Sequence, residues 1–456
     1  MESSPAKSRL SFRQLALLLV VALGLGALVG YLTLSGQPLS DLARNVFNRI
    51  GLAKSDTEIP GQWGLYEAPL DESQLSPEQR LEMRRLRSLG YAGGTVPAHS
   101  SSGVTQHDPD TASKGLRYFT SGHEPGAYLM EPDGRIVHSW HLSYDQFIRD
   151  SGLPPEDFLP DPNGVTACWR RAFLQPDGGL LVIFEGHGLA RIDRDSRLVW
   201  AYPGPCHHDL EVAGDGSIHV LTREPRMVPD IHPDKPVLVD YITRLTPTGE
   251  PLGALNLLDA FRQSEFASYL ENLPDGGDIF HTNTLEILDG RAADLSPVFR
   301  EGNYLISLRE TDVIAIVDSR TEKVVWALKG PWRAQHQPTL LEDGNILLFD
   351  NQGHAGRSKV IEIDPSTQEV VWAFEDNPTH PLYSKTCGSC QRLPGGNTLI
   401  TESDNGRALE VNRQGKIVWE FRNPERAGKD REFIAAIMEM VILPEDYRPT
   451  WLSEPQ

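Results

Sequence analysis

Cysteine and clustered positive charge are both scarce in this chain of 456 residues. Its 4 cysteines are too few for a disulfide-stabilised scaffold. Lys and Arg together number 43 against 63 Asp and Glu, which leaves a formal net charge of -20. Contacts to phosphate groups need clustered cations, and no long basic run offsets the acidic excess. We therefore do not expect nucleic acid as a partner.

Long apolar runs are also rare, and the longest extends from Leu15 to Leu34. This run of about 20 uncharged residues follows Lys7, Arg9 and Arg13 and is long enough to cross a bilayer. It exceeds the apolar core of a typical cleaved signal, and no A-x-A site follows it. We predict a single-pass inner-membrane anchor, with the main domain on the periplasmic side. A cleaved signal is the alternative, because positive charges also follow the run: Arg44, Arg49 and Lys54.

The cysteines argue against a redox or metal centre. Cys387 and Cys390 have the spacing of a redox pair, but no βαβ pattern surrounds them. A zinc site would need further ligands at suitable spacing, and none accompanies this pair. In an exported chain, Cys387 and Cys390 then either form a structural disulfide or stay unpaired. We predict no metal and no cofactor.

The chain divides into three predicted parts: 1–34, 35–114 and 115–456. The first is the cytoplasmic tip with the anchor, and the second is a linker with one short helix, Ser76–Gly90. That helix has a serine cap, proline at its first position and a glycine stop. The third part carries strand patterns throughout.

The third part repeats one strand-and-turn unit. Apolar strands end in Trp326, Trp372 and Trp419 at intervals of roughly 46 residues, the length of one four-stranded propeller blade. Turns such as Asp343-Gly344-Asn345 join neighbouring apolar runs as hairpins. The pattern predicts an all-β, six-bladed β-propeller, closed by the segment Ala435–Leu443 because an open ring would leave bare sheet edges. Blade candidates begin near Gly115, Ala172, His208, His281, His336 and Gln391.

Three of these blades begin with a histidine: His208, His281 and His336. In a propeller the innermost strands face a central channel, so equivalent positions converge on one axis. An aliphatic residue would meet a packing requirement at less desolvation cost, so three histidines in register indicate a function. His207 is adjacent to His208, and side chains alternate on a regular strand. We expect only His208 to face the channel.

With their neighbours, these residues resemble the bacterial arylsulfotransferases, of which this chain looks like a divergent member. Members of that family are exported six-bladed propeller enzymes that move a sulfuryl group between phenols without the nucleotide sulfate donor. The resemblance covers roughly 115–447 and includes the terminal segment Ile442–Tyr447. Its motifs are His208-Asp209, His281-Thr282-Asn283, Arg309, Gln335-His336 and Phe349-Asp350-Asn351.

The resemblance implies that His336 is transiently sulfated. It also implies that His208, His281, Asn283 and Arg309 surround the sulfuryl group, with Asn283 in substrate binding. The expected substrates are then small aryl sulfates and phenols. A neutral imidazole can attack sulfur and expel a phenolate, while cationic and polar donors stabilise charge on the equatorial oxygens.

Two other functions stay open. A six-bladed propeller can bind a partner or an anionic ligand at its channel mouth without catalysis. Water in place of the acceptor phenol would make the protein a sulfate-ester hydrolase. The joint presence of His336, His281 and Arg309 favours the sulfotransferase. His354 and Arg357 are interpreted as ordinary polar residues of a loop.

Overall fold

The computed structural model describes residues 99–159, 161, 164–233, 236–274, 277–354, 357–427, 431–447 and 449–453. The predicted anchor Leu15–Leu34 and the predicted helix Ser76–Gly90 lie outside these residues. None of the helices within the described ranges has the length and apolar character needed to cross a membrane. The anchor, the three-part division and the localisation therefore stay predictions.

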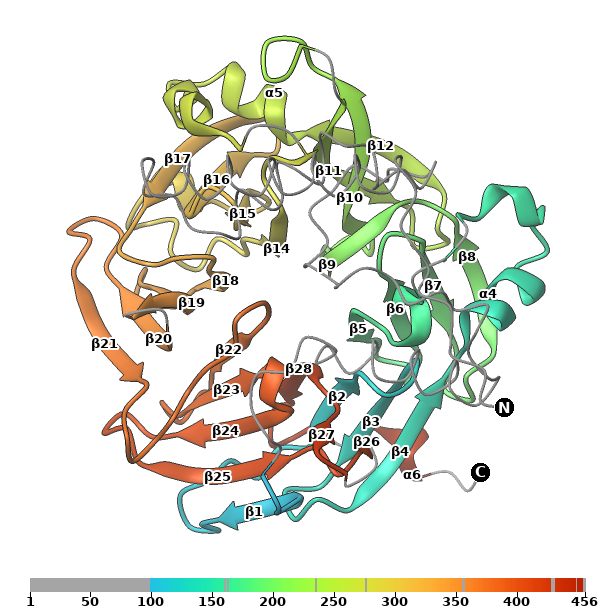
Figure 1. Ribbon diagram of the computed structural model, residues 1–456, viewed down its shortest axis with the longest axis vertical. Coiled ribbons are helices and arrows are strands. Elements are labelled where there is room, and N and C mark those ends of the chain that lie inside the picture. The colour runs from blue at the N-terminus through green and yellow to red at the C-terminus, as the bar shows by residue number, and fades with distance from the viewer. Residues whose placement is uncertain are drawn as a thin grey trace, which may run out of the picture. The chain divides into compact units, whose positions relative to one another are not determined.

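Six sheets of mainly antiparallel strands surround a common centre, and in the second to fifth blades the chain runs from the innermost strand outward (Figure 1). The predicted six-bladed propeller is confirmed. The first three blades hold β28 (Ile437–Ile442), β2 (Arg117–Ser121), β3 (Gly126–Met130) and β4 (Ile136–His141); β5 (Arg171–Leu174), β6 (Leu180–Phe184), β7 (Gly188–Ile192) and β8 (Leu198–Tyr202); and β9 (Cys206–Val212), β10 (Ile218–Met227), β11 (Pro236–Leu245) and β12 (Pro251–Asn256), with β13 (Gly277–Asp278) parallel to β11.

The other three blades follow the same order. They hold β14 (Thr282–Ile287), β15 (Tyr304–Leu308), β16 (Val313–Asp318) and β17 (Lys323–Lys329); β18 (His336–Leu340), β19 (Ile346–His354), β20 (Arg357–Ile363) and β21 (Val370–Glu375); and β22 (Ser389–Arg392), β23 (Thr398–Glu402), β24 (Arg407–Val411), β25 (Ile417–Arg422) and β1 (Gly103–His107). The remaining elements are β26 (Arg426–Ala427), β27 (Phe433–Ile434), α4 (Tyr144–Asp150), α5 (Leu257–Arg262), α6 (Thr450–Ser453), η2 (Pro155–Asp157), η3 (Val165–Ala167), η4 (Ala267–Asn272), η5 (Pro297–Phe299) and η6 (Ser403–Asn405).

Two distant strands close the ring. The C-terminal strand β28 pairs with β2 and becomes the innermost strand of the first blade, as predicted for the segment Ala435–Leu443. At the opposite end of the chain, β1 pairs with β25 and adds a fifth, outermost strand to the sixth blade. This strand lies ahead of residue 115, where the propeller was predicted to begin. Its pairing covers an edge that would otherwise be bare.

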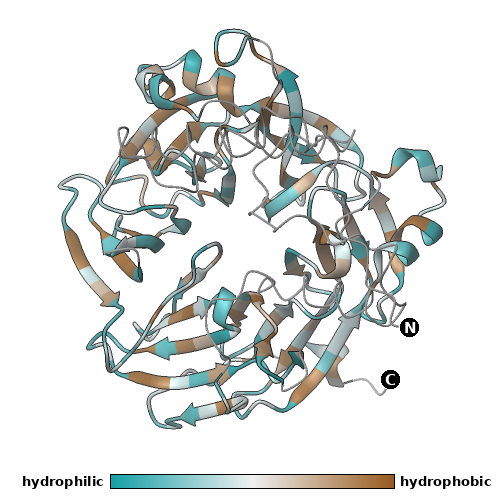
Figure 2. Ribbon diagram, in the orientation of Figure 1, coloured by the Kyte–Doolittle hydropathy of each residue, from teal (hydrophilic) through white to brown (hydrophobic). Residues whose placement is uncertain are grey.

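Apolar strands and glycine turns build each blade. Hydrophobic residues lie along the strands (Figure 2), and every residue of β6 is buried between neighbouring sheets. The hairpin turn at Gly344 has φ +83, a left-handed conformation that glycine adopts without steric cost. Local sequence thus determines the hairpins, while burial between blades holds them together.

Tryptophans tie one blade to the next. The indole Nε1 of Trp140 donates to the carbonyl of Gly178 in the second blade at 2.9 Å. Trp372 of the fifth blade donates to Arg413 of the sixth at 2.9 Å. Trp419 of the sixth blade donates to Pro132 of the first at 2.8 Å. The repeated tryptophans are therefore packing residues at blade junctions, as their spacing suggests.

Candidate active site

Three histidines lie at the inner ends of consecutive blades. His208 is in β9, His281 directly precedes β14, and His336 is the first residue of β18. His208 and His281 have positive φ angles, +53 and +50, and their rings meet edge to face with centroids 4.8 Å apart. Non-glycine residues in this conformation are strained by about 1–3 kcal/mol and cluster at functional sites.

A narrow pocket lies where the inner ends of all six blades meet. Its volume is about 20 Å³, and each blade contributes at least one lining residue. His336 and His208 both line it, so two of the predicted histidines share one pocket. The complete lining is Arg170, Arg171, His208, Asp209, Asn283, His336, Gln337, Gly388, Ser389, Met438 and Glu439.

The hydrogen bonds of His336 define its tautomer. Its Nδ1 lies 2.8 Å from Oδ1 of Asn351 and 3.1 Å from the carbonyl oxygen of Ala334. The Asn351 amide nitrogen donates to the carbonyls of Ser384 and Cys387 at 2.8 and 2.9 Å, which fixes the amide with its oxygen toward the imidazole. Two acceptors thus face Nδ1, so Nδ1 carries the proton. The Nε2 atom is buried without a hydrogen-bond partner in the described part of the chain, and its lone pair is free.

Burial keeps the imidazoles of the pocket neutral. It lowers the pKa of His336 well below 6.5, and the positive charges of Arg170 and Arg309 lower it further, whereas the Asn351 hydrogen bond opposes this shift. The pKa of His208 is also held well below its ordinary value, first by burial and then by Arg170. A neutral imidazole retains the lone pair that nucleophilic attack requires.

His281 is held from behind by a carboxylate. Its Nδ1 lies 2.8 Å from Oδ2 of Asp278, and its backbone N–H donates to Oδ1 of the same residue at 2.8 Å. Arg223 connects Asp278, at 3.3 Å, to Glu185, at 3.4 Å. Burial alone would raise the pKa of Asp278, but the hydrogen bond and charge of His281, together with Arg223, bring it to about 2. Asp278 is thus an anion that orients His281.

His207 and His208 do not alternate as expected for a regular strand. The positive φ of His208 breaks the regularity of β9, so both side chains are buried, and their Nδ1 atoms are 3.0 Å apart. His208 lines the pocket, whereas Nε2 of His207 lies 3.8 Å from Oδ1 of Asp240 behind it. The expectation that His208 faces the channel agrees with this geometry, but the pairing of the two rings was not foreseen.

Glu185, His207 and His208 bring three potential metal ligands within 4.8 Å of one another. Two guanidinium groups stand beside them, because Arg223 is 3.4 Å and Arg170 is 4.0 Å from Glu185. Positive charges at these distances oppose a bound cation. We therefore interpret the cluster as a hydrogen-bonded pair of histidines beside a carboxylate, Glu185, that forms ion pairs with two arginines.

Asn283 and Arg309, the other two predicted site residues, differ in their placement. Asn283 lines the pocket, but its amide nitrogen donates to the Gln335 carbonyl at 2.8 Å and thereby joins two blades. Arg309 directly follows β15, and its guanidinium pairs with Glu310. Arg309 is near enough to lower the pKa of His336 but does not line the pocket.

Arg170 was missed by the sequence reasoning. It precedes β5, its side chain is only 12% exposed, and it lines the pocket together with His336 and His208. Its position, at the inner end of a blade that has no histidine there, is equivalent to the positions of the three histidines. A scan for any charged residue at blade starts, rather than for histidine alone, would have found it.

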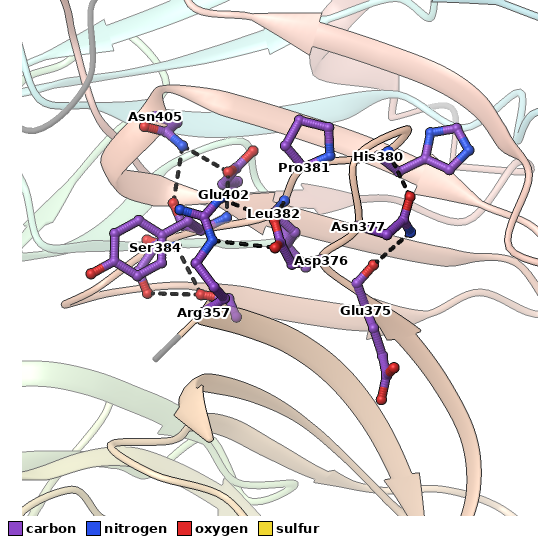
Figure 3. Close-up of polar contacts among 12 residues, drawn as sticks. Arg357, Glu375, Asp376, Asn377, His380, Pro381, Leu382, Ser384, Glu402 and Asn405 are labelled. Carbon is purple, nitrogen blue, oxygen red and sulfur yellow. Dashed lines mark hydrogen bonds and ion pairs between the residues drawn. The ribbon is translucent and has the colours of Figure 1, made fainter. Parts of the chain in front are cut away.

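The connection between β21 and β22 supports the pocket from outside. Arg357 forms two hydrogen bonds to Asp376, at 3.0 and 3.3 Å, and its guanidinium lies over the ring of Tyr383, 4.8 Å from the centroid (Figure 3). Glu402 accepts hydrogen bonds from the backbone N–H of Tyr383 and from the side chain of Asn405, both at 2.7 Å. Arg357 begins β20 and pairs with His354 at the end of β19, so both are strand residues rather than the loop residues interpreted from the sequence. These contacts place the carbonyls that hold Asn351.

The four cysteine thiols are unpaired: Cys168, Cys206, Cys387 and Cys390. Burial raises the pKa of Cys168 to about 12 and also raises that of Cys387, so both thiols stay protonated near neutral pH. A protonated thiol is a poor nucleophile and a poor metal ligand.

A family model described as Arylsulfotransferase (ASST) matches residues 172–424. Comparison with curated proteins gives no match. Similar solved structures include a protein of unknown function from Bacteroides caccae, at 14% identity and TM-score 0.47, covering 72% of this chain and 98% of that one. Virginiamycin B lyase from Staphylococcus aureus has 12% identity and TM-score 0.38, covering 71% and 88%. BamB from Moraxella catarrhalis has 12% identity and TM-score 0.31, covering 71% and 81%. These three likenesses say nothing about activity.

Proposed function

Because this chain belongs to the arylsulfotransferase family, whose model matches more than half of it, we propose that it transfers a sulfuryl group from an aryl sulfate to a phenol. We assign the intermediate to His336. The observation that carries this assignment is the free Nε2 of a neutral, buried imidazole that lines the pocket and is fixed by Asn351.

In the first step, the Nε2 lone pair of His336 attacks the sulfur of the ester. The bond between sulfur and the aryl oxygen breaks, its electron pair leaves with the phenolate, and a nitrogen–sulfur bond forms. The Nδ1 proton remains hydrogen-bonded to Asn351 and Ala334, so the ring keeps its orientation as it becomes positively charged.

In the second step, the oxygen of an acceptor phenol attacks the same sulfur. The nitrogen–sulfur bond breaks, its electron pair returns to Nε2, and the phenolic proton passes to a base. The neutral imidazole of His208 is the candidate proton acceptor. In the first step no proton donor is needed, because the aryl oxygen departs as a phenolate with the electron pair of the broken bond.

The sulfuryl oxygens need donors, since negative charge on them must be stabilised in both transition states. His208 and His281 can donate from the channel side. Arg309 supplies positive potential and can contact the oxygens only by leaving Glu310. Asn283 contributes by holding Gln335, the residue before His336.

The narrowness of the pocket limits how substrate enters. A volume of about 20 Å³ has room for little more than a water molecule, so sulfuryl oxygens enter only if flexible lining side chains shift. The aryl ring then stays in the wider channel. Because only the sulfuryl group enters the pocket, we expect the protein to select strictly for sulfate esters and to accept many different aryl groups.

The decisive experiment is a brief exposure of the protein to 4-nitrophenyl sulfate without an acceptor, followed by mass spectrometry. We expect the mass of one sulfuryl group on the peptide that contains His336. An adduct on another residue would overturn the assignment. Release of 4-nitrophenol that depends on an added phenol supports transfer, release without one supports hydrolysis, and no release supports a binding propeller.

We also propose that the propeller is anchored to the inner membrane through Leu15–Leu34 and lies on the periplasmic side. The N-terminal segment supports this topology, because positively charged residues come first, an apolar run follows, and polar residues come after it. The protein should fractionate with membranes and be cleaved by protease only after the outer barrier is opened. Recovery of a soluble protein that begins after residue 35 would contradict the anchor.

A further inference from the structure

We propose that Arg170, rather than Arg309, supplies the principal guanidinium that binds the sulfuryl oxygens. This inference rests on the proposed sulfuryl transfer and assigns its main anion-binding residue. Three observations carry it: the position of Arg170 relative to His336, the sparse partners of its guanidinium, and the commitment of the other arginines.

Arg170 and His336 come from opposite sides of the ring. Arg170 directly precedes β5 of the second blade, and His336 begins β18 of the fifth, which stand across the ring centre from one another (Figure 1). Both residues line the same narrow pocket. Because the pocket is so narrow, a sulfuryl group attacked by Nε2 of His336 would have its oxygens close to the Arg170 guanidinium.

The guanidinium of Arg170 has few partners. Across the described ranges it makes no side-chain hydrogen bond, and its one ion pair is with Glu185 at 4.0 Å. A guanidinium has five N–H donors, and within the described ranges protein acceptors take up few of those of Arg170. An anion with three oxygens would satisfy several at once, because the planar fork of arginine fits such groups with two parallel bonds.

Arg170 also provides the strongest charge that acts on the two pocket imidazoles. After burial, it contributes most to lowering the pKa of both His336 and His208. The same field attracts an anion to the spot in front of these rings. Geometry and electrostatics thus agree on where the sulfuryl oxygens bind.

The other arginines near the centre are already paired. Arg171 forms ion pairs with Asp209, at 2.9 Å, and with Glu439. Arg309 is paired with the adjacent Glu310 and does not line the pocket. Using Arg309 for the anion would first require breaking a close ion pair, whereas the ion pair of Arg170 with Glu185 is long, at 4.0 Å.

The test measures binding of 4-nitrobenzenesulfonate, an anion that cannot transfer its sulfur group, to the full chain by calorimetry. Arg170→Gln should weaken binding by roughly 10- to 100-fold, the effect of losing a charged hydrogen-bonding partner. Arg309→Gln should weaken it less. Arg197→Gln is the matched control, because this arginine is exposed in a turn of the same blade, and we expect wild-type affinity.

If Arg170 only stabilised the fold, its replacement would weaken the binding of anionic and of neutral ligands alike. Affinity for phenol, which is uncharged at neutral pH, should instead be the same in Arg170→Gln and wild type, within about 2-fold. Arg170→Lys keeps the positive charge but lacks the planar guanidinium, so we expect a loss of sulfonate affinity between those of wild type and Arg170→Gln. This variant also tests the inference if Arg170→Gln does not fold. Equal losses for sulfonate and phenol, or a larger loss in Arg309→Gln, would overturn the inference.

Failure of the proposed function gives a different result. Sulfonate binding needs no nucleophile, so it can be measured in His336→Ala. If binding depends on Arg170 but wild type forms no sulfo-histidine, the transfer mechanism fails and the anion site stands. If sulfo-histidine forms with the same KM for the ester in Arg170→Lys and wild type, the mechanism stands and this inference fails.

Discussion

Nδ1 of His336 lies 2.8 Å from Oδ1 of Asn351, and this contact decides which imidazole nitrogen is free to react. Asn351 cannot turn its amide over, because its nitrogen is held by the carbonyls of Ser384 and Cys387. The tautomer of His336, the proposed nucleophile, is therefore set by the backbone of the loop that leads into the next blade. Changes in that loop are expected to act on the chemistry without contacting substrate.

Asn351→Ala should slow sulfo-enzyme formation by roughly 10- to 100-fold, since one hydrogen bond that orients the attacking ring is lost. The measurement is the single-turnover burst of 4-nitrophenol. Asn345→Ala is the control, because Asn345 lies in a turn of the same blade and bonds to Asp343 and Glu362. An unchanged burst in Asn351→Ala would show that the ring is oriented by other contacts.

The rate of sulfo-enzyme formation should be maintained as the pH is lowered well below 6.5. Burial holds the pKa of His336 well below this value, so the reactive neutral form persists as the pH falls. Asn351→Asp places a carboxylate against the Nδ1 proton and favours the charged ring, so the loss of rate should move to higher pH. Burst rates measured across the pH range test this. A wild-type rate that halves near pH 6.5 would contradict it.

The stability contributed by Glu211 and Glu286 should fall as the pH rises from about 4.5 to 8. Burial raises the pKa of Glu211 and of Glu286 to about 8 from 4.5. Below pH 4.5 both carboxyl groups are protonated in the folded protein and in the unfolded chain. Between the two values the unfolded chain releases the proton that the fold retains, so unfolding becomes more favourable as the pH rises.

Glu286→Gln should therefore raise the melting temperature at pH 8.5 and change it little at pH 5. Glutamine keeps an oxygen that accepts the Leu340 N–H, which the carboxylate accepts at 2.9 Å. Thermal unfolding at both pH values tests this, with Glu342→Gln on the exposed neighbouring turn as the control. An equal change at both pH values would contradict the assignment to a titrating group.

Replacing Cys387 and Cys390 together with serine should leave turnover per folded molecule nearly intact. Their thiols are unpaired and are kept protonated by burial, and the Cys387 atom that matters is its backbone carbonyl. Cys390 packs in an apolar cluster, so its serine costs about 1–3 kcal/mol of stability. Activity and denaturant titrations separate the two effects. Lost turnover in a folded double mutant would restore a redox role.

Much of the fold could be predicted because each blade repeats a local pattern of apolar runs, glycine turns and tryptophan. The same repeat predicted that His208, His281 and His336 begin successive blades, but only His208 and His336 line the common pocket. Strand β1 could not be predicted, since Ser and Gly around residues 97–104 favour a loop. Its strand conformation depends on the exposed edge of β25, a feature of the folded ring.

The site details that were missed depend on conformation rather than composition. Nothing in the residue types indicates that His208 has φ +53, the feature that allows His207 to pack against it. Arg170 and Arg171 are adjacent in the sequence, yet one is paired and the other has almost no partner. Only the ring topology brings Arg170 opposite His336.

The closing strand also completes the pocket. Met438 and Glu439 of β28 form one of its six walls, and Glu439 holds Arg171 in its ion pair. A chain whose β28 is not docked on β2 lacks this wall and leaves Arg171 without Glu439. Ring closure and assembly of the proposed site are therefore a single structural event.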